Sequence, residues 1–436
     1  MIKRTFVIGL MSMLMLAPVA KAQQDTLLRL SLEQAQEYAR NHNVTVANAS
    51  LDVQKAELAK WETISTMLPQ VQASFDYQNM CGYEMVFGQP PAQMHIAMNP
   101  TGSFGITASV ALTGQQIVGA LMKSLAVQMT EISKLQNVQT INSNVKNSYV
   151  SILVMEQTAG LLDSSLANME RLASQTQSAV NAGAAEQTDA DKLAVQVATI
   201  RSSINSTKLA LQMLYNSMLL QLGADVNARL ELTTTLDQIV SVDNAAQLLQ
   251  QQFNIENNYS YQLLQQNEQL AKDQITLTYA SFAPVLSAFY QYSAKTYFGK
   301  DEGMNMTPPN MVGFSVSLPL WQTGTRILQL KQAQISLQET QNSKKQAEDG
   351  LLVQYKQLCN NLITALEEYQ IQTQNITVTD RVFSSIAEKY KFGRASSLEV
   401  TNASTDMITA QNKYIQSVMN VVSAQVALED LMNNNK

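Results

Sequence analysis

The side chains that could bind a metal ion gather in one short window of the chain. The window holds four methionines, a cysteine and a histidine: Met80, Cys81, Met85, Met94, His95 and Met98. Thioether, thiol and imidazole groups are ligands of Cu(I). The chain has 21 methionines, however, so ordinary loop composition explains the same cluster. We predict no bound metal and no cofactor.

Other chemistry finds little support in the sequence. His42 and His95 are the only histidines, and the motifs of zinc proteases, serine hydrolases and nucleotide-binding loops are absent. The net charge is −6 and the isoelectric point is near 5.2. Such a chain has no basic surface for a nucleic acid. We therefore expect neither an enzyme nor a nucleic-acid partner.

The first residues have the three regions of a secretory signal peptide. Two basic residues precede an apolar stretch over residues 5–16, and Ala20-Lys21-Ala22 matches a cleavage site. We assign residues 1–22 to the signal. No later run of 18 apolar residues occurs, so the sequence predicts no transmembrane helix.

Proline positions and apolar spacing predict long helices. Pro100 and Pro284 bracket a stretch without proline, and none follows Pro319. Proline inside a helix removes a hydrogen bond and clashes with the preceding turn. Apolar residues spaced by three and four predict a helix from about 115 to 182, about 100 Å long at ~1.5 Å per residue. That length suits a coiled coil or a tube of parallel helices. Shorter helices are predicted over residues 30–67, with Ser31 as N-cap, and over residues 261–282.

Four segments alternate apolar and polar residues and predict strands. They are residues 69–78, 103–112, 285–293 and 312–320. One apolar and one polar face over about ten residues is typical of a transmembrane β-strand. A small soluble sheet packed on helices gives the same alternation. Four strands cannot close a barrel, since the smallest have about eight, so a barrel would need several chains.

The strand and its long helix occur twice. Residues 313–320 repeat the pattern of residues 105–112 at an offset of 313 − 105 = 208. Each copy leads into a helix, a glycine turn at Gly183 or Gly393, and a second helix. We divide the chain into the signal (1–22), a first repeat (23–224), a connection around the middle of the molecule (225–260) and a second repeat (261–436).

The order of these elements resembles the TolC family of trimeric outer-membrane efflux ducts. The pattern is helix, proline-led strand, loop, strand ending in Leu318-Pro319-Leu320-Trp321, long helix, glycine turn and long helix, all duplicated. The resemblance implies a mainly α fold with a transmembrane β-barrel portion. Three chains with four strands each would form a barrel of about 12 strands, continued by a periplasmic α-helical barrel. The first copy departs from the pattern at Ala111-Leu112-Thr113, which lacks the proline and the aromatic residue.

The resemblance also implies a function. The chain would be a homotrimer in the outer membrane of a Gram-negative bacterium, in contact with its lipid and extending into the periplasm. It would pass small molecules such as drugs and toxic compounds from an inner-membrane transporter, through a periplasmic adaptor (a membrane fusion protein). Two alternatives stay open. One is a copper or silver efflux duct that uses the methionine window. The other is a secreted coiled-coil adhesion or scaffold protein with a soluble sheet.

The glycine turns are the candidate functional site, because the resemblance places them at the periplasmic tip. The residues expected to contact the adaptor are Ala182, Gly183, Ala184, Phe392, Gly393 and Arg394. The residues expected at the gate or in the lumen are Thr188, Asp189, Tyr390, Arg394, Glu399 and Asn402. A plain helical hairpin would explain the glycines equally well.

The resemblance implies specific roles at this tip. Thr188, Asp189 and Tyr390 match residues of a bonding network that holds the tip closed. Glu399 matches an acidic lumen position, although Asp189 and Glu399 would also be favourable simply as acids in the first turn of a helix. The next acidic lumen position, one turn later, is Asn402 in this chain. In the network, Ala395 replaces an arginine that Arg394 supplies one place early, which affects its salt bridge.

Overall fold

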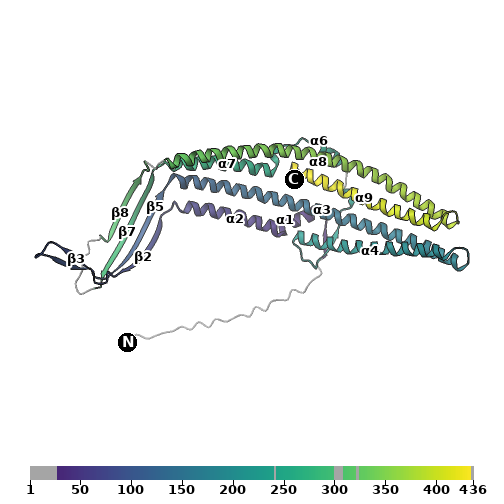
Figure 1. Ribbon diagram of the computed structural model, residues 1–436, viewed down its shortest axis with the longest axis horizontal. Helices are drawn as coiled ribbons and strands as arrows, with labels where there is room; N and C mark the ends of the chain where they lie inside the picture. Colours follow the sequence, from purple (N-terminus) through teal and green to yellow (C-terminus); the bar gives the residue numbers. More distant parts are fainter. Residues whose placement is uncertain (1–26, 240–241, 299–307, 321–323, 434–436) are drawn as a thin grey trace, which may run out of the picture.

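Long helices and one sheet make up an elongated molecule (Figure 1). The computed structural model describes residues 27–239, 242–298, 308–320 and 324–433. The sheet lies at one end, and the helices run along the long axis to two turns at the other end. The predicted signal peptide and Trp321 of the predicted strand turn lie outside the described residues.

The helices occur in matched pairs. Helices α2 (Val44–Ser65) and α7 (Tyr259–Ala280) have 22 residues each. Helix α3 (Gly114–Asn181) has 68 residues and α8 (Thr325–Lys391) has 67. Helices α4 (Gln187–Leu222) and α9 (Ser397–Met432) have 36 residues each. The helix expected over residues 115–182 is confirmed. So is the helix expected over residues 261–282, which begins two residues earlier and ends at Ala280. The duplication therefore extends to the length of each helix.

The single helix expected over residues 30–67 is wrong. Two helices, α1 (Leu32–His42) and α2, meet at Asn43, whose ψ of 130° is extended. The Asn43 side chain accepts hydrogen bonds from the amides of Thr45 (2.7 Å) and Val46 (3.4 Å) and donates to the carbonyl of Gln221 (2.6 Å). Asparagine side chains compete with helical hydrogen bonds in this way, so one residue ends one helix and caps the next. Ser31 is the N-cap of α1, as expected.

The sheet has four antiparallel strands in the order β2-β5-β7-β8. The strands are β2 (Gln70–Gln78), β5 (Thr101–Leu112), β7 (Val285–Tyr297) and β8 (Asn310–Ser317). Two predicted bounds need correction. The strand expected over 285–293 continues to Tyr297 because it pairs along all of β5. The strand expected over 312–320 ends at Ser317, just before Pro319, which has no amide to donate to a ladder.

The register separates an apolar from a polar face. Val71, Ala108, Tyr290 and Val312 form one row across the sheet, whereas Gln72, Thr107 and Gln291 share the opposite face. The apolar face is open: Phe75 is 80% exposed and Val312 is 79% exposed. No helix covers the sheet in Figure 1. This chain therefore does not pack its sheet on helices.

The sequence did not reveal two smaller strand pairs. An antiparallel hairpin of β3 (Glu84–Phe87) and β4 (Met94–Ala97) extends beyond the sheet (Figure 1). A parallel pair, β1 (Leu27–Leu30) with β6 (Arg229–Leu232), lies near the middle of the molecule. Short helices complete the connection between the repeats: α5 (Leu236–Ile239), α6 (Val242–Gln250) and η1 (Ile255–Asn257).

The core is divided along the helices rather than gathered in one place. Near the turns, buried residues of all four long helices pack together, among them Met169, Leu193, Phe383 and Val400. A second cluster around Tyr149 joins α1, α3 and α4. Within the described part of the chain, no helix is both long enough and apolar enough to cross a membrane.

Candidate functional site at the helix turns

The two turns have the same backbone. At the first, the Gly183 amide donates to the Val180 carbonyl (2.9 Å) and the Ala184 amide to the Ala179 carbonyl (2.8 Å). At the second, the Gly393 amide donates to Tyr390 (3.0 Å) and the Arg394 amide to Lys389 (2.9 Å). These bonds define a Schellman motif, which needs a left-handed residue. Gly183 has φ 73° and Gly393 has φ 68°, so the two expected glycine turns are confirmed.

The helices that follow the turns begin differently. Ser396 is the N-cap of α9, and Glu399 completes a capping box by accepting from the Ser396 amide (2.7 Å). Glu186 is the N-cap of α4 and makes no side-chain cap bond. The side chains around the two turns therefore differ although their backbones match.

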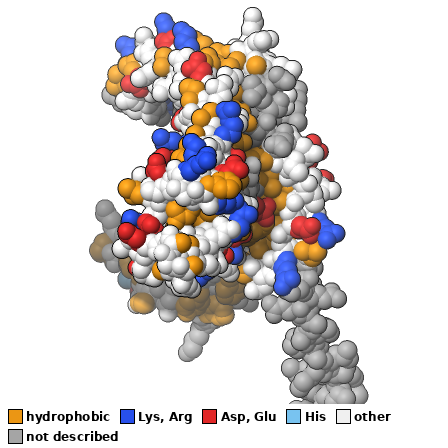
Figure 2. Space-filling view, turned by 90° about the vertical axis from the view of Figure 1, so that its right-hand side faces the viewer, with side chains coloured by type: hydrophobic (Ala, Val, Ile, Leu, Met, Phe, Trp, Pro, Cys, Tyr) orange, Lys and Arg blue, Asp and Glu red, His pale blue; other side chains and the backbone are white. Residues whose placement is uncertain are grey.

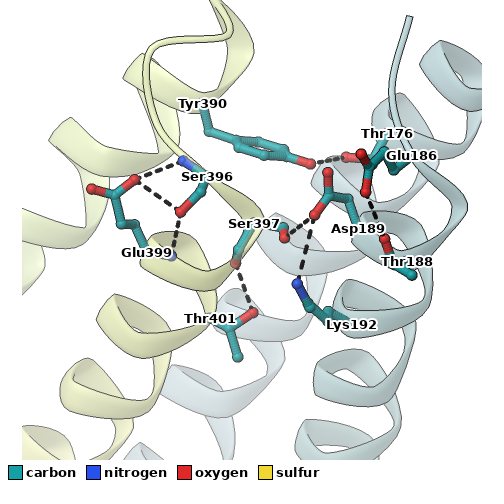
Figure 3. Close-up of polar contacts among 10 residues, drawn as sticks. All are labelled: Thr176, Glu186, Thr188, Asp189, Lys192, Tyr390, Ser396, Ser397, Glu399 and Thr401. Carbon is teal, nitrogen blue, oxygen red and sulfur yellow. Dashed lines mark hydrogen bonds and ion pairs between the residues drawn. The ribbon is translucent and has the colours of Figure 1, made fainter.

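Tyr390 joins the two helix pairs. Its hydroxyl lies 2.9 Å from Oγ1 of Thr176 on α3 (Figure 3). The Thr176 hydroxyl already donates to the Leu172 carbonyl (2.9 Å), so Tyr390 is the donor in this contact. Thr176 is 4% exposed. A hydrogen bond at a buried acceptor between two separate hairpins fixes their relative position.

Asp189 makes a second link between the same helix pairs. Its carboxylate accepts a short hydrogen bond from Oγ of Ser397, at the start of α9 (Figure 3). Nζ of Lys192 lies 3.8 Å from the same carboxylate oxygen. Ser397 is 1% exposed, so its hydroxyl depends on Asp189 as an acceptor. The two links lie side by side in Figure 3.

A groove of about 550 Å³ opens between the two turns. Thr176, Asp189 and Tyr390 line it, together with Gly393 and Lys391. The residues that bond the helix pairs therefore also form the walls of the groove. In Figure 2, this end of the molecule carries acidic and basic side chains mixed with hydrophobic ones.

Glu399 faces solvent and folds back on its own helix. Hydrogen bonds from the Ser396 amide (2.7 Å) and hydroxyl (3.0 Å), with a smaller effect of the Lys389 charge, hold the pKa of the Glu399 carboxyl below its usual value. Hydrogen bonds to the charged form of a carboxylate act in this direction. Glu399 therefore stays ionised under mildly acidic conditions.

The remaining predicted residues lie on the surface of the tip. The Thr188 hydroxyl bonds Glu186 within its own turn (3.2 Å). The side chains of Arg394, Asn402 and Phe392 are exposed, Phe392 by 71%. Ala182, Gly183, Ala184 and Gly393 are exposed as well. Contacts thus bring Tyr390 and Asp189 into one linked site, but not Thr188, Arg394 or Asn402.

Sequence reasoning missed the partners Thr176 and Ser397. Thr176 lies on the apolar face of α3, where its spacing suggests only a small side chain that packs in the core. A polar residue in such a seam is the one signal that could have pointed to it, because a buried hydroxyl needs a hydrogen-bond partner. Ser397 is the first residue of α9, where a hydroxyl group is common as part of a helix start and does not by itself indicate a distant partner.

The sequence and the fold were compared with those of known proteins. Residues 252–434 match the family model described as outer membrane efflux protein. This match covers the second repeat and part of the connection before it, which is less than half of the chain. Among curated proteins, none matches the sequence.

Solved structures of membrane channels share the fold across nearly the whole chain. The structure of CusC has a TM-score of 0.74 at 16% identity, covering 92% of this chain and 91% of that one. The Campylobacter jejuni CmeC outer membrane channel gives 0.72 at 11% identity, covering 92% and 85%. The open state of the Neisseria gonorrhoeae MtrE channel gives 0.71 at 13%, covering 92% and 88%. At these identities the likeness shows the fold.

The methionine window of this chain does not converge on a metal site. In the β3–β4 hairpin, Met85 and Met94 share one face, whereas His95 lies on the other face opposite Val86. His95 Nδ1 instead lies 3.3 Å from Glu84. Met80 and Cys81 are exposed in the loop before the hairpin, and Met98 follows it. The described residues hold no group of three or more His, Cys, Asp or Glu side chains that could bind a metal.

Proposed function

We propose that three copies of this chain form a continuous duct, which carries small molecules from an inner-membrane transporter and its periplasmic adaptor across the outer membrane. The observation that carries the proposal is the sheet with two free edges, one apolar face and no helix on either side. A four-stranded sheet leaves two rows of unpaired backbone groups, which cost free energy in lipid unless they are paired. Pairing β8 of one copy with β2 of the next removes both edges.

The helices support the same assembly. Apolar side chains point away from the chain on α4, where Val195, Leu209, Met213 and Leu220 are each at least 65% exposed. Exposed apolar stripes of this extent are typical of surfaces that another protein covers. In the proposed trimer, neighbouring helices cover them and complete a periplasmic tube. The chain regions 23–224 and 261–436 would supply one helix pair each, joined by residues 225–260.

At the far end of this tube we assign two roles to the turns. The Tyr390–Thr176 and Asp189–Ser397 bonds hold the helix pairs together in the closed state, and their release opens the end of the duct. The exposed turn residues, Phe392 and Arg394 on one hairpin and Ala182 and Ala184 on the other, contact the adaptor. Glu399 contributes one carboxylate per chain near the opening, which favours cations over anions.

Membrane fractionation with oligomer analysis tests this function. We expect the full chain to fractionate with the outer membrane and to run as a heat-resistant trimer in detergent. In planar bilayers, the purified protein should conduct ions in discrete steps. A monomer in the soluble periplasmic or secreted fraction, without channels, would instead favour the adhesion or scaffold alternative.

A further inference from the structure

The polar face of the sheet carries a phenylalanine in an unexpected place. Phe289 lies near the start of β7, in one row with Gln70, Ser109 and Gly313. The row on one side holds Gln72, Thr107, Gln291 and Met311, and the row on the other holds Ala111, Ser287 and Ser315. An aromatic ring thus lies among amides and hydroxyls, on the face that would line the lumen.

A glycine on the neighbouring strand makes room for this ring. A Cβ added at Gly313 would lie 2.2 Å from Cε1 and 2.5 Å from Cζ of Phe289. The ring therefore lies over the Gly313 backbone, in the space that any other side chain would occupy. It stays 36% exposed, so this contact does not bury it.

Met311 extends the apolar surface. It precedes Gly313 by two residues on the same face of β8, so it lies diagonally across from Phe289 and within reach of a long side chain. Its exposed fraction is 43%. We call Phe289, Gly313 and Met311 the Phe289 patch.

Covering a strand glycine with an aromatic ring stabilises a sheet, and this explains the contact with Gly313. It does not explain why the apolar surface continues to Met311 or why both side chains remain open. An extended and accessible apolar surface is expected of a site that contacts a small molecule passing along this face of the sheet. An exposed ring attracts aromatic groups and organic cations.

We infer that the Phe289 patch is a contact site for the aromatic or apolar part of a small molecule moving through the duct. This inference rests on the proposed function, because the polar face becomes a lumen wall only when three copies close the sheet. Phe289 is the fifth residue of β7, and Met311 lies opposite Gln291 at the middle of that strand, so the patch lies partway along the sheet. A molecule leaving the helical tube would pass it inside the barrel. Contacts of this kind are weak enough to allow release.

Single-channel recording of the full chain in planar bilayers tests the site with two probe cations. Benzyltrimethylammonium carries a phenyl ring, whereas tetramethylammonium lacks it. We expect the aromatic probe to block the wild-type current with about two- to tenfold higher affinity, the range for a contact between two aromatic rings. Phe289→Ser should abolish this preference and Phe289→Tyr should keep it. Ser293→Ala, on the same face of β7, is the matched control and should behave as wild type.

Two further variants keep the test decisive. Gly313→Ala forces the ring from its position and should reduce the preference while leaving the ring in the chain. Met311→Gln leaves the contact between Phe289 and Gly313 intact and should reduce the preference for the aromatic probe in part. This variant tests the patch even where Phe289→Ser forms no channels. Equal block by both probes in wild-type channels would overturn the site. Absence of channels from the wild-type chain would instead overturn the proposed function itself, and the site with it.

Discussion

At the scale of single residues, the tip depends on few polar contacts. At the turns, Tyr390 bonds Thr176 and Ser397 bonds Asp189, each across more than 200 positions of the chain. Further from the turns, Gln196 donates to Ser404 between the same two hairpins (3.4 Å). A hydrogen bond contributes about 1 kcal/mol net, so each link is weak enough to break in a functional transition. Loss of one bond should shift the balance between closed and open states without unfolding the chain.

Tyr390→Phe should raise the conductance of the resting channel, because the donor to Thr176 is lost. A loss of about 1 kcal/mol corresponds to roughly a fivefold shift toward the open state. Thr176→Val removes the acceptor of the same bond and should have the same effect. The double variant should add nothing beyond either single change.

Single-channel recording in planar bilayers measures these variants, with Tyr279→Phe on α7 as the control. The Tyr279 side chain is 55% exposed, and its hydroxyl has no hydrogen-bond partner among the described residues. An unchanged resting conductance in Tyr390→Phe would remove Tyr390 from the gate.

Glu399 gives a prediction about pH. Its pKa is lowered, so the carboxylate should keep its charge as the pH falls past the usual value for glutamate, near 4.3. Block of the current by a trivalent cation, such as hexaamminecobalt(III), should therefore persist through that range and weaken only at lower pH. Glu399→Gln should weaken the block at neutral pH, whereas Glu57→Gln on α2 should not. Undiminished block in Glu399→Gln would exclude Glu399 from the lumen.

At the scale of elements, Asn43 holds the junction of α1 and α2. Asn43→Ala removes the cap of α2 and the hydrogen bond to the Gln221 carbonyl. We expect a loss of about 1–2 kcal/mol, confined to this junction. The amides of Thr45 and Val46 should then exchange with deuterium about tenfold faster, since 1.4 kcal/mol is one factor of ten.

Hydrogen-exchange mass spectrometry measures this loss of protection. Asn48→Ala, at an exposed position of α2, is the control and should leave the exchange unchanged. Equal exchange in Asn43→Ala and the wild type would mean that packing, rather than the side-chain cap, fixes the junction.

Periodicity predicted the elements that repeat a pattern and missed those that depend on a single residue or a distant partner. The long helices and four strands follow from spacing alone. The apolar spacing continues across Asn43, so it gave no sign that α1 ends there and α2 begins. The pairing of β1 with β6 joins segments about 200 residues apart, which no local pattern encodes. The tip followed the same rule: the glycines were predicted, and Thr176 was not.

At the scale of the whole molecule, the free edge of β8 should determine assembly. The Ser293 amide donates to the Pro309 carbonyl (2.8 Å), and antiparallel ladders alternate bonded and non-bonded pairs. Counting along β8 from Pro309, the amides of Val312 and Phe314 face the open edge. Phe314→Pro removes an edge amide while leaving the β7–β8 bonds in place. We expect it to prevent trimer formation.

Phe314→Ala is the matched control, because it removes the same side chain and keeps the amide. Detergent-solubilised protein should run as a heat-resistant trimer for Phe314→Ala and as a monomer for Phe314→Pro. Trimers of equal heat resistance in both variants would show that β8 does not pair with a neighbouring chain.

The equal length of the second helices of the two hairpins has a geometric consequence. Both glycines precede the N-cap of the next helix by three residues, and both following helices have 36 residues. Around a threefold axis, six turns of two kinds would then end at one height and form a level rim. One residue inserted into α4 alone would raise every second turn by about 1.5 Å and rotate it by about 100°. A flat ring-shaped partner would then meet only three of the six turns, although every helix would still be folded.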